Sequence, residues 1–446
     1  MLTRHGLLSS LILAATFYVA AESPFGAQVV DYSTACRDLR FNNPNNVLGA
    51  PAQFVKVYSG NMGGVSSDAY GGVVHPVVPG YTGGLHLSLI SPDDEEPGYV
   101  VIAFDHDVLD DPDNPFGVDF IVFGNSGCTK STTTGMTALD DPATCRLTAQ
   151  GFPEESVVEV AQDPDGPWYG SERWRTSDGF APTLGHRYDP ANADTNLYSG
   201  NLWWGVPTDP TYPVDPRISF SDCAGLTLAE LCQRYNGSAG GAGYDLADAA
   251  DEDGNELPVD SAHGGRKWFR YVKISCSAEK KYDEDGDWDG DWLFSEPEVD
   301  AVADVRPATG YELWREKHYT DWATAWQATP EAIAANGLPN GLDYVYGLAP
   351  TTSVNSKETS FEIVSFEPGE ADHVIKMRSP VKMDSVPDGF VVQKTIAIGS
   401  GWEKIVPTLN PSVNPSVKEE GGTWLNTFTF KVPKDGAAFF RLALDE

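Results

Sequence analysis

The sequence predicts an all-β protein: a jelly-roll-like antiparallel sandwich, a short helical linker and a small second β-sandwich. Short runs of β-branched and aromatic residues are bounded by Gly, Pro, Asp or Asn, as in strands that end in turns. The 446 residues include 44 Gly and 32 Pro, which suits many short strands better than long helices. Because each strand needs a second sheet to cover its apolar face, we expect a sandwich.

Residues 1–21 have the features of a secretory signal peptide. Arg4 and His5 precede an apolar run, and Val19-Ala-Ala21 forms a small-residue cleavage site. The apolar run is shorter than the ~20 residues that span a bilayer, and no later stretch is a better candidate. We therefore expect a secreted or cell-surface protein with no transmembrane segment.

Charge divides the rest of the chain. Residues 22–306 contain 47 acidic and 17 basic side chains, and residues 307–446 contain 18 and 12. The net charge of the whole chain is −35, which argues against nucleic acid as a partner, since phosphates require a basic surface. We expect residues 22–306 to form one acidic domain.

Four segments of this domain are the clearest strands. In the last of them, apolar and polar residues alternate, and the pattern leaves open which face is buried. The segments are Tyr99–Phe104, Val118–Phe123, Ser156–Val160 and Trp268–Ile274.

All six cysteines lie in the acidic domain. An even number of cysteines in an exported protein predicts disulfides, although six cysteines allow 15 pairings. Proximity along the chain favours Cys128 with Cys145 and Cys223 with Cys232. Cys36 would then pair with Cys276. No CxxC motif supports a metal site.

Five motifs occur in this domain in the order Val29-Val-Asp-Tyr32, Phe41-Asn-Asn-Pro44 with Leu48-Gly-Ala-Pro51, Asp119-Phe-Ile-Val-Phe-Gly-Asn125, Gly243-Tyr-Asp-Leu-Ala-Asp248 and Glu298-Val-Asp-Ala-Val302. They resemble a family of exported bacterial cell-surface proteins, many of them uncharacterised. The resemblance spans roughly residues 29–305 and implies a jelly-roll sandwich and a surface location, but not an enzyme. Long insertions at 129–147 and 171–221 depart from the family pattern.

An acidic stretch at 283–291 is the first candidate calcium site. Asp283, Asp285, Asp287 and Asp289 place a carboxylate at every second residue, and glycines permit tight turns. Calcium prefers such oxygen ligands. The spacing resembles the start of an EF-hand loop but lacks the glutamate at the twelfth position. A hydrated acidic turn is the alternative.

A second calcium site is suggested by the family-like motifs. Asp119, Asn125, Asp245 and Asp300 are short oxygen donors beside apolar strand residues, where an unpaired carboxylate is costly to bury. A bound cation would compensate this cost. Arginine partners or backbone N–H groups in turns would do so equally well.

Tryptophans in loop-like stretches suggest a sugar-binding surface. Trp168, Trp203 and Trp204 lie in Gly-, Pro- and Asp-rich sequence, and exposed indoles can stack on sugar rings. The alternative is that they fill the core beneath long loops. We expect polysaccharide or other cell-surface components as partners.

No catalytic motif supports an enzyme. The chain lacks a GxSxG elbow, an HExxH pair and a P-loop. The sequence therefore favours a calcium-binding adhesion or glycan-binding protein without catalytic activity. A glycoside hydrolase or lyase, and a purely structural envelope component, are the alternatives.

The last 140 residues form a separate unit. Residues 309–329 have helical periodicity, and 336–350 closely resemble the GLSNLLEYALGLDP junction in the tails of exported bacterial proteins. We expect a partly helical linker over 307–350 and a small sandwich over 351–446 for spacing or surface display. Its strands are predicted at Ser360–Phe366, His373–Met377, Phe390–Ile396, Thr427–Val432 and Ala438–Leu444.

Overall fold

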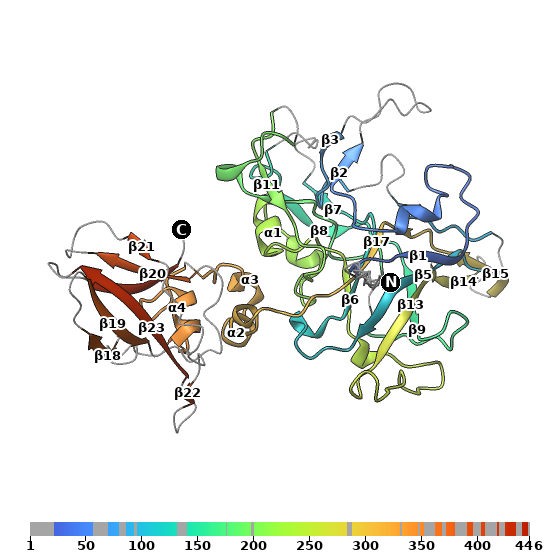
Figure 1. The fold of residues 1–446 in the computed structure, drawn as a ribbon. Helices are drawn as coiled ribbons and strands as arrows, with labels where there is room; N and C mark the ends of the chain where they lie inside the picture. The colour runs from blue at the N-terminus through green and yellow to red at the C-terminus, as the bar shows by residue number, and fades with distance from the viewer. Residues whose placement is uncertain are drawn as a thin grey trace, which may run out of the picture.

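A computed structural model describes most of the chain up to residue 351 and the strands beyond it (Figure 1). Within the described residues, no helix has both the length and the hydrophobicity that crossing a membrane requires. The described residues are 22–56, 70–79, 86–92, 96–131, 141–174, 176–197, 200–282, 288–330, 332–346, 348–351, 362–367, 372–379, 390–395, 403–405, 417–418, 424–433 and 439–444.

The protein consists mainly of antiparallel strands, which confirms the all-β prediction. One sheet has the order β1-β5-β13-β9 and a second has the order β12-β6-β17. The strands of the first sheet are β1 (Gln28–Ser33), β5 (Tyr99–Leu109), β13 (Trp268–Cys276) and β9 (Ser156–Ala161). Those of the second are β12 (Ala242–Tyr244), β6 (Phe120–Phe123) and β17 (Ala301–Asp304).

These two sheets share the main hydrophobic core. Side chains of β5 and β13 pack with those of β6 and β17, and the rings of Phe120 and Phe269 lie 4.9 Å apart. Phe269, Val272 and Ile274 are all fully buried, although in a regular strand Phe269 would point to the face opposite to Val272 and Ile274. The pairing with β5 shifts register between Phe269 and Tyr271. This bulge changes which alternate residues of β13 face the core.

A second core lies under the predicted insertions, in the part of the molecule that Figure 1 labels β7, β8, β11 and α1. Its helix α1 begins at a capping box in which Thr227 and Glu230 bond each other's backbone N–H groups. Its elements are β7 (Cys128–Lys130), β8 (Leu147–Gly151), β10 (His186–Tyr188), β11 (Trp204–Pro207), η4 (Phe220–Cys223) and α1 (Leu228–Arg234).

Short elements complete this part of the chain. They are η1 (Pro44–Val47), β2 (Phe54–Lys56), β3 (Tyr70–Val73), β4 (Leu87–Ser88), η2 (Pro115–Gly117), η3 (Pro190–Asn192), η5 (Leu246–Asp248), β14 (Ala278–Tyr282), β15 (Trp288–Phe294) and β16 (Glu298–Val299).

The predicted helical segment is interrupted. Helix α2 (Gly310–His318) ends before α3 (Trp322–Ala325), and α4 (Asn340–Tyr346) follows. Arg306 links this segment to the preceding domain, because its guanidinium bonds both Asp209 (2.8 Å) and Glu312 (2.9 Å). Arg315 of α2 likewise donates to the hydroxyl of Tyr212 at 2.7 Å.

The five predicted C-terminal strands correspond to β18, β19, β20, β23 and β24. They form two sheets, ordered β18-β19-β23-β22 and β21-β20-β24, in the lobe beside α4 in Figure 1. Their bounds are β18 (Glu362–Glu367), β19 (Asp372–Ser379), β20 (Phe390–Thr395), β21 (Glu403–Ile405), β22 (Val417–Lys418), β23 (Trp424–Pro433) and β24 (Phe439–Leu444).

Candidate metal centres

The acidic stretch at 283–291 falls largely outside the described residues. Asp283, Asp285 and Asp287 lie outside them, as does the side chain of Asp289. From Trp288 onward the stretch forms β15, which pairs with β14. The residues after Asp287 are thus part of a strand, and calcium binding by this stretch stays a prediction. An alternating acidic and aromatic sequence has the period of a strand as well.

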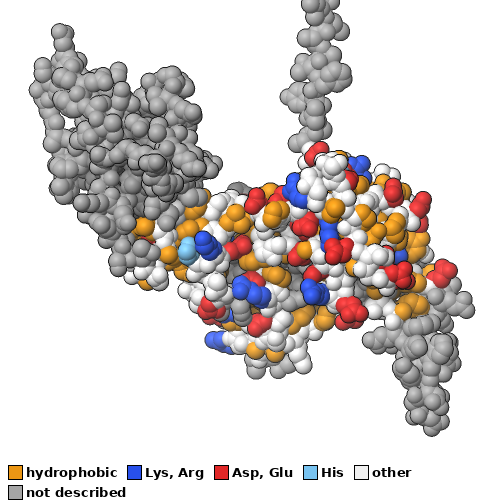
Figure 2. All heavy atoms as spheres, turned by 90° about the horizontal axis from the view of Figure 1, so that it is seen from below, with side chains coloured by type: hydrophobic (Ala, Val, Ile, Leu, Met, Phe, Trp, Pro, Cys, Tyr) orange, Lys and Arg blue, Asp and Glu red, His pale blue; other side chains and the backbone are white. Residues whose placement is uncertain are grey.

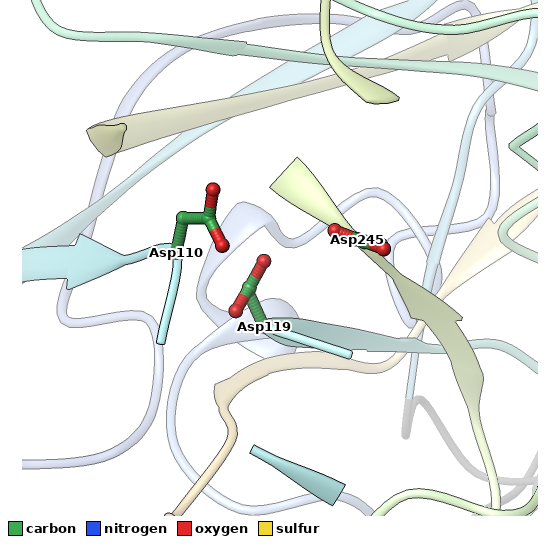
Figure 3. Close-up of side chains that lie close together, drawn as sticks. All are labelled: Asp110, Asp119 and Asp245. Atoms are coloured by element: carbon green, nitrogen blue, oxygen red, sulfur yellow. The ribbon is translucent and has the colours of Figure 1, made fainter. Parts of the chain in front are cut away.

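Two of the predicted ligands, Asp119 and Asp245, do lie together, and Asp110 joins them. Figure 3 shows the three carboxyl groups, which come from the end of β5, the start of β6 and the end of β12. One oxygen of each lies within 4.8 Å of the others. Asp110 is the member that the sequence interpretation missed.

Backbone and amide donors already surround Asp119, the buried member. Its Oδ1 accepts from Asp111 N (3.1 Å) and Asn114 Nδ2 (2.9 Å), and its Oδ2 accepts from Leu246 N (2.8 Å). Burial nevertheless raises the pKa of Asp119 to about 7. We call Asp110, Asp119 and Asp245 the 119 cluster. Its hydrogen bonds fit a carboxylate held by backbone N–H groups in turns as well as they fit a cation site.

Asp300 and Asn125 lie elsewhere. Asp300 is buried and accepts a hydrogen bond from Ala52 N at 2.7 Å, and burial raises its pKa to about 8. Asn125 follows β6, next to Ser126. Neither belongs to the 119 cluster. In the sequence, Asn125 precedes Ser126 and Asp300 follows Glu298 by two residues; Ser126 bonds a second group of carboxyls, and Glu298 is part of it.

That second group is Glu154, Asp178 and Glu298, which we call the 178 cluster. One oxygen of each again lies within 4.8 Å of the others. Glu154 precedes β9, Asp178 lies in the loop before β10, and Glu298 begins β16. The backbone holds them in place: Glu154 N donates to Asp178 O at 3.1 Å.

Asp178 is the centre of this cluster and has no exposed surface. Its Oδ1 accepts from Ser126 N at 2.6 Å, and its Oδ2 accepts from Glu298 N at 3.3 Å. Gly124 permits this approach, because a Cβ at that position would lie 2.4 Å from Asp178 Oδ1. The loop after β6 is therefore built around the Asp178 carboxylate.

The 178 cluster concentrates negative charge without a strong base. Among the described residues, no lysine or arginine forms an ion pair with these three groups, and His86 Nε2 lies 4.0 Å from Glu298 Oε1. Burial raises the pKa of Asp178 to about 7. Burial and the neighbouring Glu154 and Asp178 carboxyls raise the pKa of Glu298 to about 10.

One oxygen of the 178 cluster also lacks a hydrogen bond. Glu154 Oε2 is shielded from solvent and has no partner among the described residues. A buried acceptor in this state costs about 1–3 kcal/mol. The cluster can be relieved in two ways, by protons shared between carboxyls or by a divalent cation that all three coordinate.

The sequence contained one usable sign of this cluster. Glu298 belongs to the motif Glu298-Val-Asp-Ala-Val302, from which the sequence interpretation chose Asp300. Glu298 begins β16, whereas Asp300 lies between β16 and β17, so the motif alone did not show which of its two carboxyls joins the cluster. The sequence around Glu154 and Asp178 contains no motif that marks them as ligands, because they meet Glu298 only in the folded chain.

Two of the three tryptophans expected to form a sugar-binding surface belong to the second core or pack against it. Trp204 is 1% exposed in the second core, and Trp203 packs against that core. Trp168 is partly buried, with Lys273 Nζ 5.5 Å from its ring centre. Trp203 and Trp204 therefore fill the space beneath the long loops, which was the alternative to a sugar-binding surface, because large aromatic surfaces are best buried.

The expected disulfides are also not formed. All six cysteines are buried thiols in the structure, and none of the pairs Cys128–Cys145, Cys223–Cys232 and Cys36–Cys276 is bonded. Proximity along the chain was a poor guide, since the nearest sulfur contact joins Cys128 to Cys223 at 3.9 Å.

Acidic and basic side chains are interspersed over the face seen in Figure 2, so the negative charge forms no single patch on that face. The buried carboxyl clusters are the most distinctive chemical feature of the described residues. The family resemblance stays a prediction. No protein-family model, curated protein or solved structure matches this chain.

Proposed function

We propose that this chain is an exported, surface-associated calcium-binding protein that serves adhesion rather than catalysis. The observation that supports it best is the 178 cluster, where the partly buried Glu154 and Glu298 converge on the fully buried Asp178 from distant parts of the chain. The jelly-roll resemblance and the predicted signal peptide support the extracellular part of this proposal.

Calcium suits the 178 cluster better than other common ions. Three carboxylates offer up to six oxygens, and Ca²⁺ takes 6–8 hard oxygen ligands in flexible geometry. Zn²⁺ favours nitrogen and sulfur ligands, and Mg²⁺ retains most of its water, which a buried cluster leaves little room for. Protons alone would have to neutralise these carboxylates at the neutral pH of most extracellular fluids. Ca²⁺ is abundant in the same fluids and would neutralise them there.

Calorimetry on the full chain tests the site. We expect calcium to raise the melting temperature of chelator-treated protein, since a ligand at about 100 times its Kd stabilises the bound state by about 2.7 kcal/mol. Glu154→Gln should remove most of this shift. Glu154 Oε2 forms no hydrogen bond among the described residues of the parent protein, so the variant is expected to fold.

Glu155→Gln is the matched control, because Glu155 is the exposed neighbour of Glu154. It should retain the full calcium shift. An equal calcium shift in Glu154→Gln and Glu155→Gln, or no shift in the parent protein, would contradict the proposed site.

A pocket favours glycan binding as a second function. A cavity of about 370 Å³ lies between the acidic domain and helices α2 and α3. Aromatic rings and guanidinium groups line it, and Glu316 Oε1 is buried there without a hydrogen-bond partner among the described residues. Sugar rings stack on such aromatic walls, and a hydroxyl could donate to this oxygen. The lining includes Phe116, Tyr212, Arg315, Glu316, Tyr319 and Trp326.

Saturation-transfer NMR with a mixture of neutral oligosaccharides tests the pocket. We expect signal transfer that Trp326→Ala abolishes and that Trp168→Ala, outside the pocket, leaves unchanged. Loss of transfer in Trp168→Ala with retention in Trp326→Ala would instead favour the site expected from the sequence. No transfer to the parent protein would refute sugar binding by both sites.

A further inference from the structure

Four of the six cysteines gather in the second core, which joins segments far apart in the sequence. They are among the most buried residues of that core, none more than 4% exposed. They come from β7, the turn before β8, the end of η4 and helix α1. The residues are Cys128, Cys145, Cys223 and Cys232.

Cys128 and Cys223 face each other directly. Their sulfur atoms lie 3.9 Å apart, and 95 residues separate them in the sequence. A disulfide has a sulfur separation near 2.05 Å, so closure requires the two sulfurs to approach by about 2 Å. Both thiols are fixed near one another by neighbouring backbone bonds: Leu147 N donates to Leu226 O at 2.8 Å, which ties β8 to the residues after η4.

Cys145 and Cys232 are the other two cysteines of this core, and the backbone of Cys145 meets the helix that carries Cys232. The carbonyl of Cys145 accepts from Leu228 N at 2.8 Å, at the first turn of α1. Cys232 is four residues after Leu228, so it lies on the same face of the helix, one turn further along.

We infer that this core is closed by two disulfides, Cys128–Cys223 and Cys145–Cys232. The inference rests on the export that is part of the proposed function, because an oxidising compartment is needed. The oxidant is a disulfide-bearing thiol oxidoreductase or small disulfide. A cysteine thiolate attacks its S–S bond, and the second cysteine displaces it, so that two protein thiols and one disulfide give one protein disulfide and two reduced thiols.

The pairing would join the two insertions of the domain. Cys128 precedes the first insertion and Cys145 lies near its end, whereas Cys223 and Cys232 follow the second insertion, so each bond joins the first insertion to the residues after the second. Pairing of cysteines nearest in sequence would instead close two separate short loops. Closure of long loops restricts the unfolded chain more strongly, so the long-range pairing is the more stabilising one.

A tetrathiolate metal site is the competing use of four cysteines. It requires all four sulfurs near one ion. Among the described residues, no three of these sulfurs lie within 4.8 Å of one another, whereas those of Cys128 and Cys223 lie 3.9 Å apart. The arrangement therefore fits two bonds better than one ion.

Peptide mapping of the full chain tests the inference. Reduced, purified protein is refolded with a mixture of reduced and oxidised glutathione, free thiols are alkylated, and peptides are analysed without reduction. We expect peptides that join Cys128 to Cys223 and Cys145 to Cys232, and a mass about 2 Da lower for each bond. Reduction should lower the melting temperature by roughly 5–10 °C.

Single variants check the assignment. Cys223→Ser should leave Cys128 open to alkylation in unfolded protein while Cys145 stays bonded to Cys232, and Cys36→Ser should leave both bonds intact. Linkage of Cys128 to Cys145, four alkylated cysteines after refolding, or bound zinc would overturn the inference. Calcium titration of the same sample tests the proposed function separately. Oxidation in vitro does not depend on export, so the disulfides can form even if the proposed function is wrong.

Discussion

His106 shows how a single residue can connect the two sheets. Its Nδ1 lies 2.8 Å from Asp105, and its Nε2 lies 3.0 Å from Asp304 at the end of β17. The hydrogen bond to Asp304, together with Asp105, outweighs burial and raises the pKa of His106 to about 9. The imidazolium is therefore a structural charge that joins β5 to β17.

We expect His106→Gln to destabilise the protein by about 1–2 kcal/mol at pH 6, since hydrogen bonds to charged groups are lost. Because the folded pKa is above the unfolded value of about 6.5, the stabilisation is complete below pH 6.5 and disappears as the pH rises through 9. Urea unfolding at pH 6 and at pH 9.5 measures this difference. An equal cost at both values would show that the charge is unimportant.

At the scale of elements, the second sheet depends on a close backbone approach. Gly241, just before β12, has a φ of +82°, and a Cβ there would lie 2.3 Å from the side chain of Ile121 in β6. The strand can pair with β6 only if this position has no side chain. Gly254 has the same φ of +82°, but a Cβ at that position would meet nothing within 4 Å among the described residues.

The two glycines therefore make a matched test. Gly254→Ala should cost about 1 kcal/mol, the penalty for a left-handed backbone alone. Gly241→Ala should cost about 1–3 kcal/mol more, because the methyl group overpacks the core. Chemical denaturation of both variants gives the comparison. Similar losses would indicate that β6 and β12 move apart without penalty.

For the whole molecule, the buried carboxyls predict a link between pH and calcium. Folding raises the pKa of Asp178 to about 7 and of Glu298 to about 10, so the folded state holds protons that the unfolded state releases. Without calcium, stability should therefore fall as the pH rises from about 4, where unfolded carboxyls ionise, through 7 and beyond.

Calcium should counteract this fall by replacing the protons. We expect the calcium-induced rise in melting temperature to be several degrees larger at pH 8 than at pH 5.5, where protons compete for the same oxygens. Scans with calcium and with chelator at both values measure it. Asp300 also has a raised pKa, but it lies outside both clusters. Its contribution to the pH dependence of stability is therefore the same with and without calcium. A calcium shift that is independent of pH would contradict coordination by the 178 cluster.

The sequence by itself determined the class of the fold and the positions of many strands. Tyr99–Phe104, Val118–Phe123 and Trp268–Ile274 form strands because β-branched and aromatic residues favour extended backbone locally. It also identified Asp119 and Asp245, since each lies in a conspicuous acidic and apolar motif. Local patterns could not show the bulge in β13, which depends on pairing with β5.

Only the tertiary structure decided which groups meet. Glu154, Asp178 and Glu298 converge across more than a hundred residues, and Cys128 lies beside Cys223 instead of the nearer Cys145. The indole of Trp204 is likewise buried by an insertion whose path local sequence does not specify. Strand formation follows from the preferences of neighbouring residues, whereas these contacts follow from how whole segments pack, which the free energy of the complete core determines.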